Sequence, residues 1–159
     1  MELVWATEDF VIAGQPYTGF PILLWDSMES CVPANQFFRH YLLRGAIGSR
    51  QSWPSTGRAL YDFFSFLQAH ELDWRDVDRG EAKSLVAGYR DFCLSTCKLA
   101  VNTTRQRLMY TCKFYEFALK EGWVKRLPFS YEERAVRRQT SFLAHLIIKS
   151  YDDDSIMSS

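Results

Sequence analysis

The sequence is poor in the residues that build metal centres and disulfide frameworks. It has four cysteines and three histidines in 159 residues, with no CxxC, HxxH or HExxH arrangement. A zinc site or a catalytic metal therefore has few ligands available, and a chain long enough to bury a core does not need disulfides. We expect reduced, mostly buried cysteines, no bound metal and no other cofactor.

Further absences exclude common classes of protein. The motifs GxGxxG, GxxxxGK[ST] and GxSxG do not occur, so the usual phosphate cradles and the nucleophile elbow of hydrolases are missing. No apolar run approaches the roughly 20 residues that cross a bilayer, and the start Met1-Glu2 is unlike a signal peptide. These features lead us to expect a soluble, cytoplasmic protein without membrane contact.

The chain does have the composition of a folded domain, and its charge is unevenly divided. Hydrophobic residues make up 47% and aromatic residues 16% of the sequence. The 19 basic and 19 acidic residues cancel, yet ten basic and only four acidic residues fall between 98 and 138. A local positive excess in a neutral protein is typical of a face that meets phosphate, although a solvated basic helix has the same composition.

The hydrophobic pattern predicts an all-α bundle of four to five helices that follows an extended or β N-terminal arm. Residues 3–25 mix β-branched and aromatic residues with glycine and proline, which indicates short strands or an extended segment. Apolar residues then recur at helical spacing over 33–44, 55–69, 78–94, 102–121 and 130–151. We therefore predict an arm over 1–32, a helical domain over 33–129, a linker helix over 130–151 and a disordered tail over 152–159.

Polar residues mark the expected helix starts. Ser55 or Thr56 is placed to cap the second helix, whose core face is expected to be Leu60, Phe63, Phe64 and Leu67. The third and fifth helices are expected to begin at capping-box pairs, Asp78 with Glu81 and Ser130 with Glu133.

The fourth helix has two faces and is expected to end at Gly122. The apolar stripe predicted to face the core is Val101, Leu108, Cys112, Tyr115 and Leu119. The residues predicted to project from the far side are Thr103, Gln106, Tyr110, Lys113 and Phe117, with Arg107 on the flank. Arg105 is expected nearer the core, paired with Glu116 or Asp91.

Several motifs stand in a particular order between 55 and 129. STGRALYDFFSFL fills 55–67, LDW follows at 72–74, Thr103 and Arg107 lie four apart with Phe114-Tyr115 later on the same helix, and EGWVKRLPF fills 121–129. In this order they resemble the N-terminal core-binding domain of tyrosine recombinases, the phage integrase group, which has a SAM-like helical fold. The resemblance covers about 33–130. It departs at Leu127, where the family usually has asparagine before the proline.

The resemblance implies a DNA-binding domain that grips a recombination site. In the family the second and fourth helices of this domain face the major groove, and catalysis belongs to a following domain with its own arginines, histidines and nucleophilic tyrosine. We therefore expect no enzymatic activity in this chain, a parent protein that cleaves and rejoins DNA, double-stranded DNA as partner, and self-association on DNA. The residues expected to contact DNA are Ser55, Thr56, Arg58, Asn102, Thr103, Gln106, Arg107, Tyr110 and Lys113.

Each assignment has a structural alternative. Arg107 or Gln106 is the candidate for reading a base edge, and the hydroxyls and other cations are candidates for phosphate contacts. Helix capping accounts equally well for Ser55, Thr56, Asn102 and Thr103, and solvated surface charge accounts for Arg107 and Lys113. Tyr61, Phe114 and Tyr115 are expected to be packing residues. Arg134, Arg137 and Arg138 either contact backbone phosphates or keep a terminal helix soluble.

A second function stays open, that of a helical protein-interaction module. A continuous positive patch over the second and fourth helices would favour DNA, whereas scattered basic residues beside an exposed apolar patch would favour a protein partner.

Overall fold

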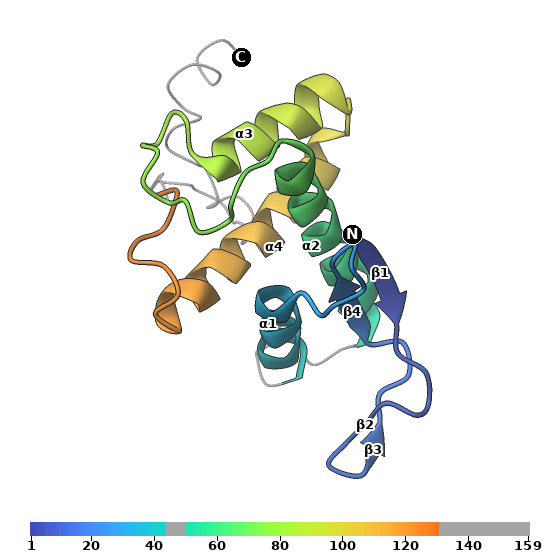
Figure 1. Ribbon diagram of the computed structural model, residues 1–159. Helices are drawn as coiled ribbons and strands as arrows, with labels where there is room; N and C mark the ends of the chain where they lie inside the picture. Colours follow the sequence, from blue (N-terminus) through green and yellow to red (C-terminus); the bar gives the residue numbers. More distant parts are fainter. Residues whose placement is uncertain (44–49, 131–159) are drawn as a thin grey trace, which may run out of the picture. The chain divides into compact units, whose positions relative to one another are not determined.

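A computed structural model describes residues 1–43 and 50–130 (Figure 1). This part of the chain is mostly helical, with four α-helices and two short pairs of antiparallel strands near the N-terminus. The chain divides into two compact units, Met1–Ser65 and Phe66–Ser159. The predicted helical class and the short strands of the arm are therefore confirmed, while an all-α description leaves out these strands.

The arm of the first unit is built from two strand pairs. β1 (Glu2–Trp5) runs antiparallel to β4 (Pro21–Leu24), with Trp5 opposite Pro21. Between them, β2 (Val11–Ile12) and β3 (Gln15–Pro16) form a hairpin that extends beyond the first pair (Figure 1). Its turn residues Ala13 and Gly14 have φ angles of 50° and 80°. Two successive positive φ angles are what a tight hairpin turn of the right twist requires.

Helix α1 (Val32–Leu43) holds the arm through one side chain. The Leu23 backbone N–H donates to Oδ1 of Asn35 at 2.8 Å, and Nδ2 of Asn35 donates to the Leu23 carbonyl at 2.8 Å. The outer edge of β4 is thus closed by a side-chain amide, as a neighbouring strand would close it. The arm and α1 belong to the same compact unit, whereas the sequence places a boundary at 32/33.

Helix α2 (Trp53–Ala69) begins earlier than predicted, after the 3₁₀ turn η1 (Arg50–Ser52). The hydroxyls of Ser55 and Thr56 donate to the Ser52 carbonyl at 3.2 and 2.7 Å, so neither residue is the N-cap. Pro54 explains the earlier start, because a proline is tolerated in the first helical turn, where its N–H is not needed. The predicted core face is confirmed, since its four residues are all buried.

The third helix also begins elsewhere than predicted. α3 (Leu85–Asp91) is capped by Ser84, whose Oγ accepts the Ala87 N–H at 3.1 Å, and a π-helical turn, η2 (Phe92–Thr96), follows it. The capping-box prediction for Asp78 and Glu81 is therefore wrong. Both carboxylates are engaged further along the chain, by Arg126 and Ser130 respectively.

Helix α4 (Val101–Lys120) ends as predicted, with Gly122 at a φ of 79°. In the core of the second unit, the buried Tyr115 hydroxyl donates to the Trp74 carbonyl at 2.6 Å, and the Phe114 ring packs edge-on to Trp74. The packing role predicted for Phe114 and Tyr115 is confirmed, whereas Tyr61 is exposed.

Some predictions fall outside the described residues. They are the fifth helix over 130–151 beyond Ser130, its three arginines Arg134, Arg137 and Arg138, and the tail over 152–159. Within the described residues, none of the helices combines the length and the apolar character that crossing a membrane requires.

Candidate nucleic-acid interface

The N-terminal half of α4 carries the exposed part of the predicted DNA-binding face. Asn102 and Gln106 are exposed, and Thr103 and Arg107 are half-buried. Val101, predicted to be a core residue, is 57% exposed. The buried stripe begins instead at Thr104, whose hydroxyl donates to the Ala100 carbonyl at 3.1 Å. The predicted apolar stripe is wrong at this end. A threonine whose hydroxyl bonds to a backbone carbonyl of its own helix can be buried, although its side chain is polar.

The second half of α4 is covered on more than one side. Tyr110 is only 5% exposed and Phe117 is buried, although both were predicted to project from the helix. Leu119, predicted to be core, is exposed. The Phe117 ring packs edge-on to Trp123, with ring centres 5.3 Å apart, and α4 also contacts α3 and η2, so the helix buries a wider arc than one apolar stripe. Tyr110 is therefore unavailable to a duplex, and the predicted face is limited to the first turns of α4.

Lys113 lies beside a carboxylate. Its Nζ is 3.3 Å from Oε1 of Glu116, one turn further along the helix, and both side chains are about one-third exposed or less. A phosphate contact by Lys113 would compete with this ion pair. Lys113 is consequently a weaker candidate than the residues of the first turns.

The start of α4 leaves backbone groups open. Its N-cap is Ala100, which supplies no side-chain cap, so capping by Asn102 or Thr103 is not what the structure has. The first N–H groups of a helix point outward without intrahelical partners and carry partial positive charge. Anionic groups such as phosphate are favoured at such an end.

Five cations in the described part of the second unit are paired with acids. The pairs are Arg75 with Asp73, Arg79 with Asp76, Arg90 with Asp91, Lys113 with Glu116 and Arg126 with Asp78. Lys98 and Arg105, which flank the start of α4, are exposed and have no carboxylate partner within residues 1–43 and 50–130.

Arg105 is thus a candidate that the sequence missed. The expected pairing with Glu116 or Asp91 is wrong, because these acids bind Lys113 and Arg90. For Glu116 a signal was present in the sequence, since Lys113 lies three residues before it on the same helix.

In the first unit, the predicted contacts on α2 differ in exposure. Arg58 is exposed, and its Cζ lies 5.6 Å from the centre of the Trp5 ring. Ser55 is half-buried, whereas Thr56 is 0% exposed with its hydroxyl bound to Ser52. The prediction that Thr56 contacts DNA is therefore wrong, because its side chain is covered by the protein.

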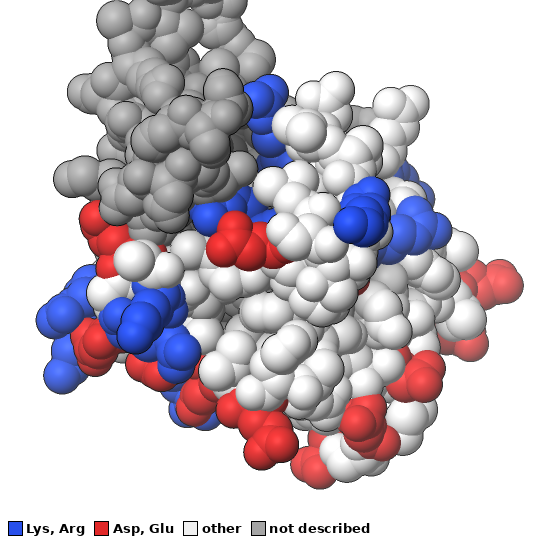
Figure 2. All heavy atoms as spheres, turned by 90° about the horizontal axis from the view of Figure 1, so that it is seen from above, with Lys and Arg blue, Asp and Glu red and all other residues white. Residues whose placement is uncertain are grey.

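Charge on the face in Figure 2 is mixed. Lys and Arg side chains stand there in separate small groups, several of them beside Asp or Glu, and large areas carry neither sign. On this face the cations are scattered, which by the criterion stated above favours a protein partner. Binding of DNA would have to depend on a few cations at the start of α4.

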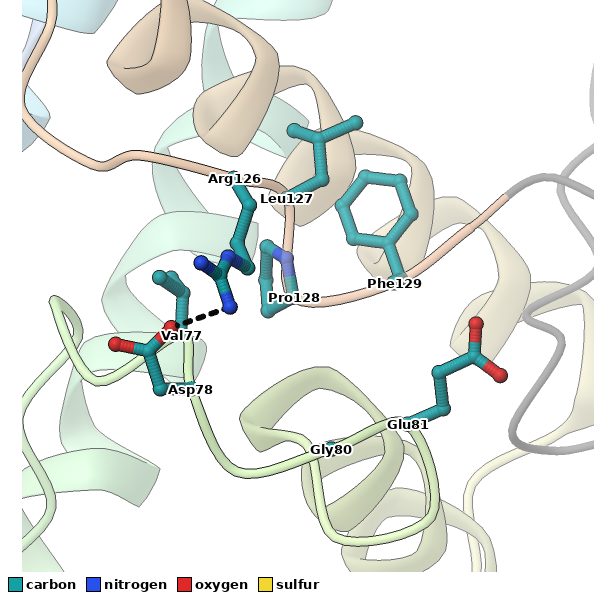
Figure 3. A pocket seen from close by; sticks show the side chains of 8 residues that line it. All are labelled: Val77, Asp78, Gly80, Glu81, Arg126, Leu127, Pro128 and Phe129. Atoms are coloured by element: carbon teal, nitrogen blue, oxygen red, sulfur yellow. Dashed lines mark ion pairs between the residues drawn. The ribbon is translucent and has the colours of Figure 1, made fainter.

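A cavity of about 390 Å³ lies elsewhere in the second unit (Figure 3). Its lining residues are Val77, Asp78, Gly80, Glu81, Arg126, Leu127, Pro128 and Phe129. Nη1 of Arg126 is 2.9 Å from Oδ1 of Asp78, and Glu81 accepts a hydrogen bond from Ser130 at 2.9 Å. Two carboxylates and one guanidinium sum to negative charge, so this cavity does not suit phosphate.

The buried thiols and the buried phenol belong to the core. Burial raises the pKa of Cys31 to about 11, and it also raises the pKa of Cys112 and Tyr115. Such groups are neutral near pH 7 and therefore poor nucleophiles. Cys93 is buried too, whereas Cys97 is exposed.

Comparison with known proteins adds no relative. The chain matches no protein-family model, no curated protein and no solved structure at a significant level. Function is therefore inferred from the residues themselves.

Proposed function

We propose that this chain binds double-stranded DNA and that the first turns of α4 are its principal contact. In this proposal it is the core-binding, SAM-like domain of a tyrosine recombinase, holding the recombination site while a following domain cleaves and rejoins the strands. The observation that carries the proposal is the exposed start of α4, where amides, open backbone N–H groups and cations without an acidic partner among the described residues lie together.

The cations at this helix end suit the phosphate backbone. Lys98 and Arg105 are exposed without a carboxylate partner among the described residues, so neither has to break an ion pair to bind phosphate. Five other cations of the second unit would have to do so. Phosphate contacts of this kind supply most sequence-independent affinity for DNA.

The amides suit the base edges. Asn102 and Gln106 lie four residues apart, so they share one side of the helix, and both are exposed. Each amide donates and accepts hydrogen bonds, which matches the N6 and N7 atoms of adenine in the major groove. A helix fits that groove, so Gln106 and Asn102 are the proposed base readers, with Arg107 on their flank.

A salt titration with paired variants tests the proposal. Binding to a fluorescent duplex is measured by anisotropy for the wild type, for Lys98→Gln with Arg105→Gln, and for Lys120→Gln with Lys125→Gln. The control removes the same charge from exposed positions at the other end of α4 and beyond it, which have no acidic partner in the described part of the chain. Each lost phosphate contact lowers the slope of log K against log salt by about 0.9.

The first double variant is therefore expected to lose about 1.8 from the slope, and the control is expected to keep it. Equal losses in the two double variants would show only an effect of net charge and would contradict the assignment to the start of α4. Absence of duplex binding by the folded wild type would overturn the proposed function.

Exposed apolar residues in the first unit favour the second candidate, a protein-interaction module. Met28 is 60% exposed in the turn before α1, and Val32, the first residue of α1, is 51% exposed. If these residues form an interface, Met28→Ser with Val32→Ser will abolish capture of a protein partner and leave duplex binding unchanged. Loss of duplex binding in that variant would speak against a separate protein interface.

A further inference from the structure

We infer that the N-terminal arm builds a second DNA contact, in the first unit, by stacking Arg50 and Arg58 on aromatic rings. This inference depends on the proposed DNA-binding function. A DNA contact by Arg58 is already implied by the resemblance, and what is added here is Arg50 and the positioning of both arginines by the arm. The arm would then be a positioning element for two phosphate-binding arginines, and Trp5 and Tyr17 would be positioning residues.

Arg50 is held between the hairpin and the start of α2. Its Cζ lies 4.9 Å from the ring centre of Trp53 and 5.7 Å from that of Tyr17. Its Nη2 also donates to the Pro16 carbonyl, at 3.4 Å. The buried Trp53 ring packs in turn on Phe20 at 5.0 Å, so the ring beneath Arg50 is fixed by the core of the unit.

Arg58 is held by β1. The Trp5 ring beneath it is 38% exposed, with its centre 5.6 Å from the Arg58 Cζ. Trp5 reaches this position because the neighbouring residue on α2 is Gly57. A Cβ at Gly57 would lie 2.8 Å from the Pro21 Cβ and 3.4 Å from the Trp5 ring, so only glycine lets β1 and β4 lie this close to the helix.

Stacking orients these arginines without neutralising them. Neither has a carboxylate partner in the part of the chain that the structure describes, and both side chains are exposed. A guanidinium over a ring face still presents N–H groups to an oxyanion. In Arg50 one of these groups, on Nη2, already donates to the Pro16 carbonyl, so the remaining N–H groups would contact phosphate. The ring contact restricts the side chain and so reduces the entropy that it loses on binding.

Duplex phosphate is the occupant that charge complementarity favours. Phosphates recur along the whole backbone and accept two N–H groups from one arginine, and the α4 contact would already bring a duplex to the protein. An acidic protein surface would use the same arginines, and it is the alternative that the test separates.

The charge test compares three matched variants in the first unit. Duplex affinity and its salt dependence are measured for Arg50→Gln, Arg58→Gln and Arg39→Gln. Arg39 is exposed on α1 and has no ring beneath it among the described residues, so its variant controls for net charge. The first two variants are expected to weaken binding at least about threefold and to lower the salt slope by about 0.9 each, with little change for Arg39→Gln.

The positioning test keeps the charge and removes the ring. Trp5→Leu is expected to weaken duplex binding severalfold while the salt slope stays within about 0.3 of the wild type, since Arg58 still reaches phosphate but less well oriented. A thermal melt confirms that the variant is folded. Wild-type affinity in folded Trp5→Leu would overturn the positioning role.

Failure of this inference is distinguishable from failure of the proposed function. If the Lys98 and Arg105 variants weaken duplex binding but Arg50→Gln and Arg58→Gln behave as Arg39→Gln does, the α4 contact stands and the arm contact is refuted. If the wild type binds no duplex, both are refuted, and binding of an acidic protein through Arg50 and Arg58 would then explain the stacked pair.

Discussion

At the residue scale, two helical glycines have opposite surroundings. Gly57 lies against β1 and β4, whereas a Cβ at Gly88 in α3 would meet nothing closer than the Phe66 ring at 3.9 Å. Glycine inside a helix costs about 1 kcal/mol relative to alanine. The chain tolerates this cost at Gly57 because the close approach of the arm requires it.

Substitution of the two glycines should therefore change stability in opposite directions. Gly88→Ala should raise the free energy of unfolding by about 0.5–1 kcal/mol through helix propensity. Gly57→Ala should lower it by about 1–2 kcal/mol, because the overlap with Pro21 exceeds that gain. Urea unfolding of both variants measures the difference. Shifts of the same sign would contradict the close approach of the arm to α2.

Cys31 offers a pH-dependent test of burial. Burial raises the pKa of its thiol to about 11, while a hydrogen bond from the Ala34 backbone lowers it by less. The unfolded thiol titrates near 8.5. The folded state therefore keeps its proton longer, and the stability contributed below that unfolded pKa is lost as pH rises towards 11.

The difference in unfolding free energy between wild type and Cys31→Ala should consequently shrink above pH 9, by up to about 1.4 kcal/mol per pH unit. Cys97→Ala, the same substitution at an exposed cysteine, is the control. Denaturation at pH 8, 9 and 10 provides the measurement. A constant difference for Cys31→Ala would show that the thiol is accessible to water.

At the element scale, a single amide joins the arm to α1. Asn35→Ala would leave the N–H of the fully buried Leu23 without its acceptor, which costs about 2 kcal/mol for a buried donor. The Leu23 carbonyl would still accept a hydrogen bond from the Cys31 N–H, at 2.9 Å. Asn102→Ala, on the exposed start of α4, is the control and should change stability little. Thermal melts measure the loss of stability, and equal melting temperatures for the two variants would refute this role of Asn35.

Helix existence was predictable from the sequence, whereas helix starts and helix faces were less so. The stretches 33–44 and 102–121 match α1 and α4 within a residue or two, because long apolar repeats and a terminal glycine are strong local signals. The start at Asp78 failed because its carboxylate binds Arg126, almost fifty residues further along the chain. Local spacing contains no information about such a partner.

The faces of α4 show the same limit. Thr104 and Thr111 are buried because each hydroxyl donates to a backbone carbonyl one turn earlier, at 3.1 and 2.9 Å. A hydrophobicity pattern treats such threonines as polar, so it predicts the apolar stripe of α4 at the wrong positions around the helix. Tyr110 and Phe117 were predicted to lie outside because the shifted stripe placed them opposite the core, yet both are buried, and Phe117 packs against Trp123.

At the scale of the whole molecule, a neutral chain is proposed to bind a polyanion through a small number of unpaired cations. Of the residues predicted from the sequence, Asn102, Thr103, Gln106, Arg107 and Arg58 remain candidates, and Lys98, Arg105 and Arg50 join them. These additions could not be predicted from the sequence. Arg105 is left without an acidic partner among the described residues because Glu116 and Asp91 pair with other cations, and Arg50 is identified by its contact with the Trp53 ring. Thr56 and Tyr110 are excluded by burial, which the sequence pattern did not reveal.

NMR chemical-shift mapping of the whole chain with a short duplex tests the central claim most directly. Because the start of α4 is the proposed contact, the largest amide shifts are expected for residues 98–107, and the α4 end at Lys120 and the cavity at Gly80 should change little. Shifts concentrated around the cavity, or none at a duplex concentration that saturates binding, would contradict the account.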